Sequence, residues 1–296
     1  MAKKRTPRKK AAPKKRVTPK NNPDRHVDPD SVNVNAWQVP NLDIDELRTS
    51  ITKECKKRAT TLGADPIGSP VFEDRIKMVD KKEWDHYIET VDSIEVDMPW
   101  VHDQNGDGQC TCEATSTAYE VQDFIDDGAA VRHSPAHLYK RINGGVDRGS
   151  NIDRALEEIA ENGLLPAPNQ GFEHSFPLVG WRNRHPVGWT STAERFKATE
   201  WMDIATSEGF VNALFRRWPV VWGRRGHAIC AVKLIKVDGI LYIRSRNSWG
   251  QYKLYLTDSF STLQRYIDYY GAWALCSTKL RTNESTGVST EPSTVL

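Results

Sequence analysis

The chain has 296 residues, of which 38% are hydrophobic, and its net charge is +2. That length and composition predict one large or two modest globular domains, and they exclude a chain too polar to bury a core. The five cysteines are an odd number, and we find no secretory signal before them. We therefore expect reduced thiols in an intracellular, cytoplasmic protein and not a disulfide framework.

The basic charge is concentrated in residues 1–20, which hold ten of the 41 Lys and Arg and no acidic residue. The rest of the chain has 31 basic and 39 acidic residues and is acidic overall. This tail has no apolar stretch, so we predict a disordered segment that is neither a secretory signal nor a membrane anchor. Two interpretations stay open, a contact with nucleic acid or an acidic partner and a solvated extension. No aromatic residue lies among the charges, which argues against recognition by stacking.

The expected regions follow from the composition and the periodicity. Residues 21–35 continue the tail as a polar linker, and a helical arm is expected over 36–96. In that arm, apolar residues recur at helical spacing from Ile44 to Leu62, and a second amphipathic piece runs from Lys81 to Val91. The main domain is expected to follow the arm, at 97–281. A polar, disordered end is expected at 282–296.

The segment from Gln104 to Glu120 holds a polar turn, a cysteine and a run of small residues that predicts the start of a helix. Gly106 and Gly108 break any regular element before Cys110. Cys110 is therefore expected in the first helical turn, where unpaired backbone N–H groups and the helix dipole favour a thiolate. A thiolate is a nucleophile, so Cys110 is a candidate catalytic residue.

The pattern of elements changes along the main domain. Helices are expected at 134–139, 151–162 and 201–215, with a long irregular connection over 167–195. From Pro219 onward the pattern is that of strands, at 220–223, 227–237, 240–245, 253–256 and 273–280. Helices first and strands second predict an α+β domain.

Two of these strands place a base and an amide together. His227 begins one alternating run, Asn247 follows the next, and Asp238-Gly239 between the runs predicts a hairpin turn. The hairpin would set His227 and Asn247 at the same end. A nucleophile, a base and a group that orients the base are the parts needed for acyl transfer.

These residues resemble the papain-like cysteine peptidases over roughly 97 to 279. Gln104 precedes Cys110 by six positions, as the family's oxyanion glutamine precedes its nucleophile. The other matches, in chain order, are Gly108 in the turn before the nucleophile, Glu120 on the helix, Gly226-His227-Ala228 as the histidine strand and Asn247-Ser248-Trp249-Gly250 as the asparagine motif.

The resemblance implies a two-lobed fold, with a helical first lobe that carries the Cys helix and an antiparallel β second lobe that carries His and Asn. It implies Cys110 as nucleophile, His227 as its proton partner and Asn247 as the residue that orients the imidazole. The Gln104 amide and the Cys110 N–H would hold the oxyanion, and Trp249 would cover the His–Asn contact. Family precedent also allows residues 36–96 to be a removable pro-region, but the usual pro-helix pattern is not found. We therefore favour an arm that packs permanently on the domain.

The chain departs from the family beside the nucleophile. Thr111 stands where an aromatic residue is usual, and Glu113 stands where an apolar residue is usual. The first cysteine of the family's Cys-Gly-Ser-Cys turn is missing, and Cys112 competes with Cys110 for the nucleophile's role. The spacing from Gln104 decides for Cys110.

The sequence predicts no cofactor and no metal. A calcium-loop pattern begins at Asp103, but its twelfth position is Ala114 where a glutamate is needed. Our first hypothesis is a cysteine peptidase with a polypeptide substrate and no membrane partner. The alternatives are a catalytically silent papain-like body that the basic tail tethers to nucleic acid or a virus particle, and an amidase or isopeptidase with the same residues.

Overall fold

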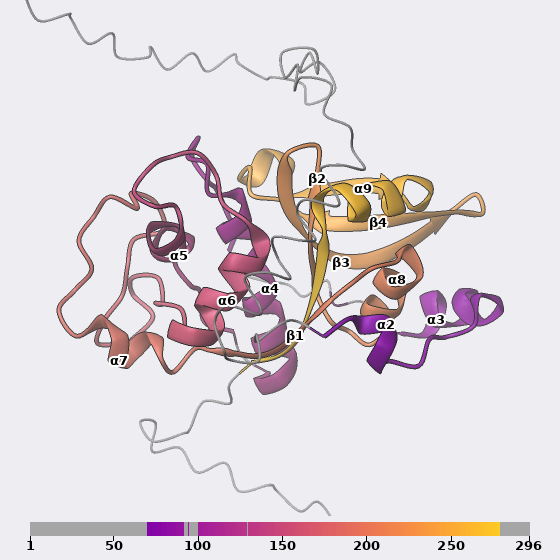
Figure 1. Ribbon diagram of the computed structural model, residues 1–296, viewed down its shortest axis with the longest axis horizontal. Helices are drawn as coiled ribbons and strands as arrows, with labels where there is room; N and C mark the ends of the chain where they lie inside the picture. The colour runs from indigo at the N-terminus through magenta and orange to yellow at the C-terminus, as the bar shows by residue number, and fades with distance from the viewer. Residues whose placement is uncertain (1–69, 92–93, 95–99, 129, 279–296) are drawn as a thin grey trace, which may run out of the picture. The chain divides into compact units, whose positions relative to one another are not determined.

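The computed structural model describes residues 70–91, 94, 100–128 and 130–278 (Figure 1). The chain separates into two compact units, Met1–Pro66 and Ile67–Leu296, and every described residue belongs to the second unit. The expected basic tail and linker, the helix from Ile44 to Leu62 and the polar end at 282–296 lie outside the described residues.

A group of packed helices forms the first lobe. Its central element is the 18-residue helix α4, Cys110–Asp127, which contacts α5, Pro135–Ile142, and α6, Ile152–Asn162. The short helix α7, Trp189–Ala193, lies within the long, mostly irregular connection that the sequence predicts (Figure 1). Gly128 ends α4 in a left-handed conformation, with its N–H bonded to the Phe124 carbonyl. No helix among the described residues has both the length and the apolar character needed to cross a membrane.

A six-stranded antiparallel sheet forms the second lobe, in the order β1-β6-β2-β3-β4-β5. Its strands are β1 Ala198–Asp203, β2 Val220–Arg224, β3 His227–Val237, β4 Ile240–Arg246, β5 Tyr255–Ser259 and β6 Ala272–Thr278. Helix α8, Ser207–Phe215, and helix α9, Leu263–Tyr270, pack on this lobe. Trp222 of β2 is fully buried and contacts Phe210 of α8 edge to face. Two 3-10 turns, η3 Gln251–Lys253 and η4 Phe260–Thr262, flank β5.

The hairpin predicted from Asp238-Gly239 is present. Val237 pairs with Ile240, so the turn has two residues, and both have positive φ, 50° and 77°. Such a turn matches the twist of the strands and favours Asp-Gly. The first lobe meets the sheet through α4, which packs against β3 and β6 (Figure 1).

Two expectations of the secondary structure are wrong. Residues 201–203 belong to β1 and not to a helix, which begins only at Ser207 after the Thr206 side chain caps it. The tertiary pairing of Trp201 with Leu275 overrides the local pattern there. Helix α9 was not expected, although Leu263, Tyr266, Ile267 and Tyr270 recur at helical spacing.

The part of the expected arm that the structure describes is packed on the second lobe. It contains α2, Phe72–Arg75, η2, Lys81–Glu83, and α3, Trp84–Thr90. Phe72 is fully buried, 6.0 Å from Trp218 between ring centroids. Glu73 Oε1 accepts hydrogen bonds from Thr206 N at 2.8 Å and Thr206 Oγ1 at 2.7 Å, and so covers the start of α8.

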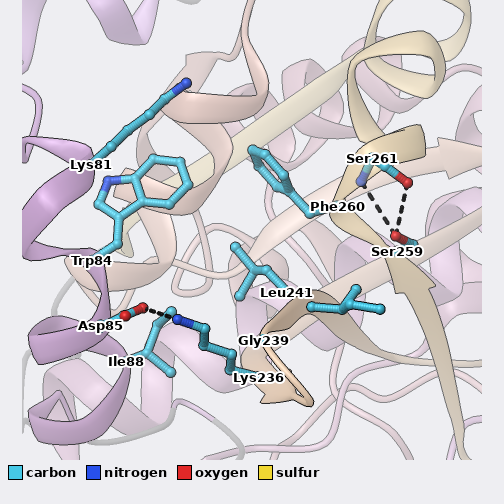
Figure 2. A pocket seen from close by; sticks show the side chains of 11 residues that line it. Lys81, Trp84, Asp85, Ile88, Lys236, Gly239, Leu241, Ser259, Phe260 and Ser261 are labelled. Atoms are coloured by element: carbon cyan, nitrogen blue, oxygen red, sulfur yellow. Dashed lines mark hydrogen bonds and ion pairs between the residues drawn. The ribbon is translucent and has the colours of Figure 1, made fainter.

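A pocket of about 540 Å³ opens between α3, the β3–β4 turn and η4 (Figure 2). Trp84, Leu241 and Phe260 line its apolar part, and Lys236 and Asp85, which form an ion pair, line it as well. None of the candidate catalytic residues lines it, so the chemistry of this protein has to be sought elsewhere.

Candidate active site

Cys110 is the first residue of α4, as expected, and it faces the second lobe. The Ala228 main chain lies close enough to the Cys110 thiol to lower its pKa by hydrogen bonding to the thiolate form. Ala228 follows His227 directly at the start of β3, so the thiol lies beside the strand that carries the candidate base. The side chain is half-buried, whereas Cys112, Cys230 and Cys276 are buried.

Burial and local hydrogen bonds act on the thiol in opposite directions. Burial raises the pKa of Cys110, and the main-chain hydrogen bonds with Ala228 and Thr111 partly offset that rise. The start of α4 also favours the anion, as the sequence predicts. The negative charge of Glu113 raises the pKa of Cys110 further, so a thiolate here needs an opposite charge beside it.

His227 and Asn247 are brought together at one end of the hairpin. His227 Nε2 lies 2.7 Å from Asn247 Oδ1, and Asn247 Nδ2 donates to the Lys253 carbonyl at 2.9 Å. Because the Lys253 carbonyl needs a donor, the amide nitrogen has to face it, and the amide oxygen faces the ring. Nε2 therefore carries the proton in the neutral ring, and Nδ1 is left as the base.

Trp249 covers the His–Asn contact. Its ring stacks on the His227 ring with 4.7 Å between centroids and 24° between planes. Burial lowers the pKa of His227, while the hydrogen bond with Asn247 raises it and the positive charge of Arg224 lowers it further. Arg224 is itself paired with Asp258 at 2.7 Å. A neutral imidazole is therefore the favoured resting state of the base.

Gln104 is held at both ends of its side chain. Its Nε2 donates to the Asp107 carbonyl at 2.9 Å, and its Oε1 accepts from the Ser248 hydroxyl at 2.8 Å. Its main-chain N–H donates to the Ser248 carbonyl at 3.0 Å. Ser248 follows Asn247, so the turn that orients the imidazole also fixes Gln104. One N–H of the amide remains available for a developing oxyanion.

Gly108 is required by the close approach of another loop. A Cβ at this position would lie 2.9 Å from both Asp147 Oδ1 and the Gly149 nitrogen. The Gly108 N–H donates to Asp147 at 2.8 Å, and Tyr139 donates to the same oxygen at 2.7 Å. Burial and the adjacent Asp147 raise the pKa of Tyr139 to about 12, so it stays a donor. The loop at 147–149 therefore braces the turn before the nucleophile.

The departures beside the nucleophile also have structural partners. Thr111 is buried and donates a hydrogen bond to the Ser150 carbonyl at 2.9 Å. The start of α4 is therefore also bonded to the residue that follows the loop at 147–149. Cys112 is fully buried, 3.8 Å from the Ser150 hydroxyl, and burial raises its pKa well above the usual value. That environment disfavours Cys112 as a nucleophile.

One group of residues near the site was missed by the sequence analysis. His102 is buried between Glu113 and Glu120 of α4, 2.7 Å from each carboxylate. A signal was present, because Glu113 and Glu120 are two turns apart on one face of the expected helix. Two buried carboxylates on one face require a cation opposite them. Within the described residues, no group of three or more His, Cys, Asp or Glu is placed to hold a metal ion.

Comparison with the models of known protein families and with curated proteins found no match. Among solved structures, xylellain, a cysteine protease from Xylella fastidiosa, matches with a TM-score of 0.52 and 18% identity, over 71% of this chain and 91% of the xylellain chain. Digestive procathepsin L 3 of the Tenebrio molitor larval midgut gives a TM-score of 0.47 and 17% identity, over 61% of this chain and 66% of that one. The chain therefore has the papain-like α+β fold of two lobes, as its sequence predicts. At such identities the likeness concerns the fold alone.

Proposed function

We propose that this protein is a cysteine peptidase that hydrolyses peptide bonds through an acyl-enzyme. The observation that carries the proposal is the His227–Asn247 contact at 2.7 Å, at the start of the strand whose Ala228 main chain lowers the pKa of the Cys110 thiol. Nucleophile, base and orienting amide are thus supplied by the two lobes where they meet. The papain-like fold supports the same assignment, and no cofactor is needed for the reaction.

In the acylation half, His227 Nδ1 takes the Cys110 proton, and the sulfur attacks the carbonyl carbon of the scissile bond. The carbonyl π electrons move to its oxygen, where the Gln104 amide and the Cys110 N–H stabilise the negative charge. The imidazolium then gives its proton to the leaving nitrogen. The C–N bond breaks, the amine departs and a thioester remains on Cys110.

In the deacylation half, His227 takes a proton from water while the water oxygen attacks the thioester carbon. The C–S bond breaks, the carboxylic acid is released, and the sulfur leaves as thiolate and takes back the proton from the His227 imidazolium. Asn247 holds the ring in the same tautomer in both halves, because its oxygen can only accept the Nε2 proton. Trp249 keeps water from that hydrogen bond, which strengthens it.

The substrate class follows from the fold and the chemistry. Xylellain is described as a cysteine protease, and an extended polypeptide held between the two lobes would be bound through main-chain hydrogen bonds. We propose a polypeptide substrate. Binding of nucleic acid or an acidic protein through residues 1–20 stays a prediction from the sequence.

The test combines thiol labelling with peptide hydrolysis. In the first experiment, the full chain is treated with iodoacetamide at pH 6–7, and the labelled residues are mapped by mass spectrometry. In the second, unlabelled protein is incubated with a mixture of unfolded proteins, and the cleavage sites are identified. We expect fast labelling at Cys110 alone, lost in His227→Ala, and hydrolysis that Cys110→Ala abolishes.

Cys112→Ala is the matched control, because Cys112 is two residues away on the same helix. It should keep both the labelling of Cys110 and the hydrolysis. Labelling that prefers Cys112, or hydrolysis that survives Cys110→Ala, would contradict the proposal. Fast labelling of Cys110 without cleavage of any peptide bond would point to an acyl transfer other than peptide hydrolysis.

A further inference from the structure

His102 is a buried ionisable residue that the proposed reaction does not use. Its side chain is 3% exposed. Nδ1 lies 2.7 Å from Glu113 Oε2 and Nε2 lies 2.7 Å from Glu120 Oε2. A neutral imidazole donates from only one nitrogen, so only the imidazolium donates to both carboxylates. His102 is therefore a charged bridge inside the protein.

The two carboxylates are fixed by further donors. Glu113 Oε1 accepts from Gln109 Nε2 at 2.6 Å, and Glu120 Oε1 accepts from the His133 main-chain nitrogen at 2.7 Å. Trp100 Nε1 also donates to Glu120 at 2.9 Å. Because both carboxylates have additional donors and belong to α4, they present a rigid acceptor pair to His102.

The main chain around His102 is joined to the turn that carries Asn247. The Gly250 N–H donates to the His102 carbonyl at 3.1 Å, and Asp103 forms an antiparallel bridge with Trp249. Gln104, two residues after His102, is bonded to Ser248. The segment 102–104 therefore runs along the 248–250 turn as a short ladder.

His102 thus links the helix of the nucleophile to the segment of the oxyanion donor. We propose that His102 is a positioning residue, whose two hydrogen bonds to Glu113 and Glu120 hold Gln104 in register with Cys110. The inference rests on the proposed function, since Gln104 matters only for an oxyanion. Without the bridge, the ladder still ties Gln104 to Ser248, but the 102–104 segment loses its side-chain attachment to α4.

The charge of the bridge depends on every group around it. Glu113 and Glu120 face His102 from α4, while Arg132 and His133 approach the same carboxylates from the following segment. Burial disfavours the imidazolium, but the charge of Glu120 and the hydrogen bonds of both carboxylates outweigh it and raise the pKa of His102 to about 9. The bridge is therefore intact at neutral pH and opens in alkaline solution.

The first test replaces the bridge and reads kcat, KM and labelling separately on the full chain. His102→Gln should lower kcat about 10-fold or more and leave KM within about 3-fold, because the oxyanion contact forms only in the transition state. Iodoacetamide alkylation of Cys110 forms no oxyanion, so its rate should change little. Glu158→Gln, which breaks the Arg141–Glu158 pair in the helical lobe, is the control. It should leave kcat, KM and the rate of alkylation unchanged.

Glu113→Gln is the milder variant, in case His102→Gln does not fold. Its amide oxygen still accepts from His102, but one of the two negative charges is gone. The alkaline decline of kcat should then begin at lower pH than in the wild type, because the imidazolium loses one opposite charge. The charge of Glu113 also raises the pKa of Cys110, so the pH profile of alkylation should move to lower pH as well. A residue that only supports the fold would leave the alkaline decline of kcat where it is in the wild type.

A third readout does not need activity. In nuclear magnetic resonance spectra of the wild type at pH 7, both ring N–H protons of His102 should be slow to exchange, and His102→Gln should shift the side-chain amide signals of Gln104. If no peptide is hydrolysed by the wild type, the proposed function fails, and this readout still decides the position of Gln104. Unmoved Gln104 signals, or a kcat within 2-fold of wild type in a folded His102→Gln, would overturn the inference.

Discussion

Asn247 accepts a hydrogen bond from Nε2 of His227 while its own amide nitrogen is held by the Lys253 carbonyl. The two bonds fix the amide in one orientation, and the amide fixes the imidazole in one tautomer. The basic nitrogen, Nδ1, is consequently the one left for the thiol. A single side chain therefore determines both the direction of the ring and the identity of its base.

Replacing Asn247 by Ala should release the ring and lower kcat/KM by on the order of 100-fold, because misplacing a reacting group by about 1 Å has that effect. Steady-state kinetics on a peptide substrate measure the loss. Asn143→Ala is the control, since Asn143 is also a buried asparagine but lies at the end of α5. An equal loss of activity in both variants would show that the effect is on folding.

Replacing Gln104 by Ala should lower kcat by about 100-fold with little change in KM, because the amide acts only on the oxyanion. Ser248→Ala removes the hydroxyl that holds Gln104 Oε1 and should give a smaller loss in the same direction. The rate of Cys110 alkylation should be unchanged in both variants. A fall in alkylation would mean that Gln104 acts on the thiol and not on the oxyanion.

Gly108→Ala should destabilise the protein by about 1–3 kcal/mol, since its Cβ would press on Asp147 and on the Gly149 main chain. Urea denaturation measures the change. Removing the Asp147 side chain in addition should not restore stability, because the main-chain nitrogen of Gly149 stays in place. Full recovery in Gly108→Ala/Asp147→Ala would place the clash on the carboxylate alone.

Stability should fall as the pH rises through the range in which His102 loses its proton. The pKa of His102 is about 9 in the folded protein against 6.5 for an unperturbed ring, so its contribution is complete below pH 6.5 and is lost toward pH 9. A rise of this size corresponds to on the order of 3 kcal/mol. Urea denaturation between pH 6 and 9 should show this slope in the wild type. The slope should be absent in His102→Gln, and a parallel slope in that variant would refute the assignment.

Glu73→Ala should lower the free energy of unfolding by about 1–3 kcal/mol, because it removes a carboxylate that accepts three hydrogen bonds from Ala205 and Thr206, just before α8. Asp74→Ala, at an exposed neighbour, is the control and should have little effect. If residues 70–91 are a permanent arm, the active protein should retain them. Sequencing of its N-terminus checks this, and an active form that begins after Val91 would instead support the removable pro-region.

The part of the candidate site on the hairpin was predictable from a short, local pattern, because the turn at Asp238-Gly239 sets His227 and Asn247 at one end. The place of Gln104 relative to Cys110 was expected only from the resemblance to the peptidase family, since the spacing alone does not assign an oxyanion donor. Glu113 was recognised as a departure from the family, but its partner could not be named. His102 lies eleven positions earlier in the chain, and nothing in the sequence pattern between them requires the two to meet.

The sequence by itself determined the α+β class, the strands β2 to β4 and the pairing of His227 with Asn247, since turn chemistry and alternation act over a few residues. Only the tertiary structure decided that Trp201 enters a strand and that Gly108 must lack a side chain. It alone also decided that His102 is charged between two buried carboxylates. These properties depend on which distant segments exclude water from one another, and burial, unlike periodicity, is a property of the whole fold.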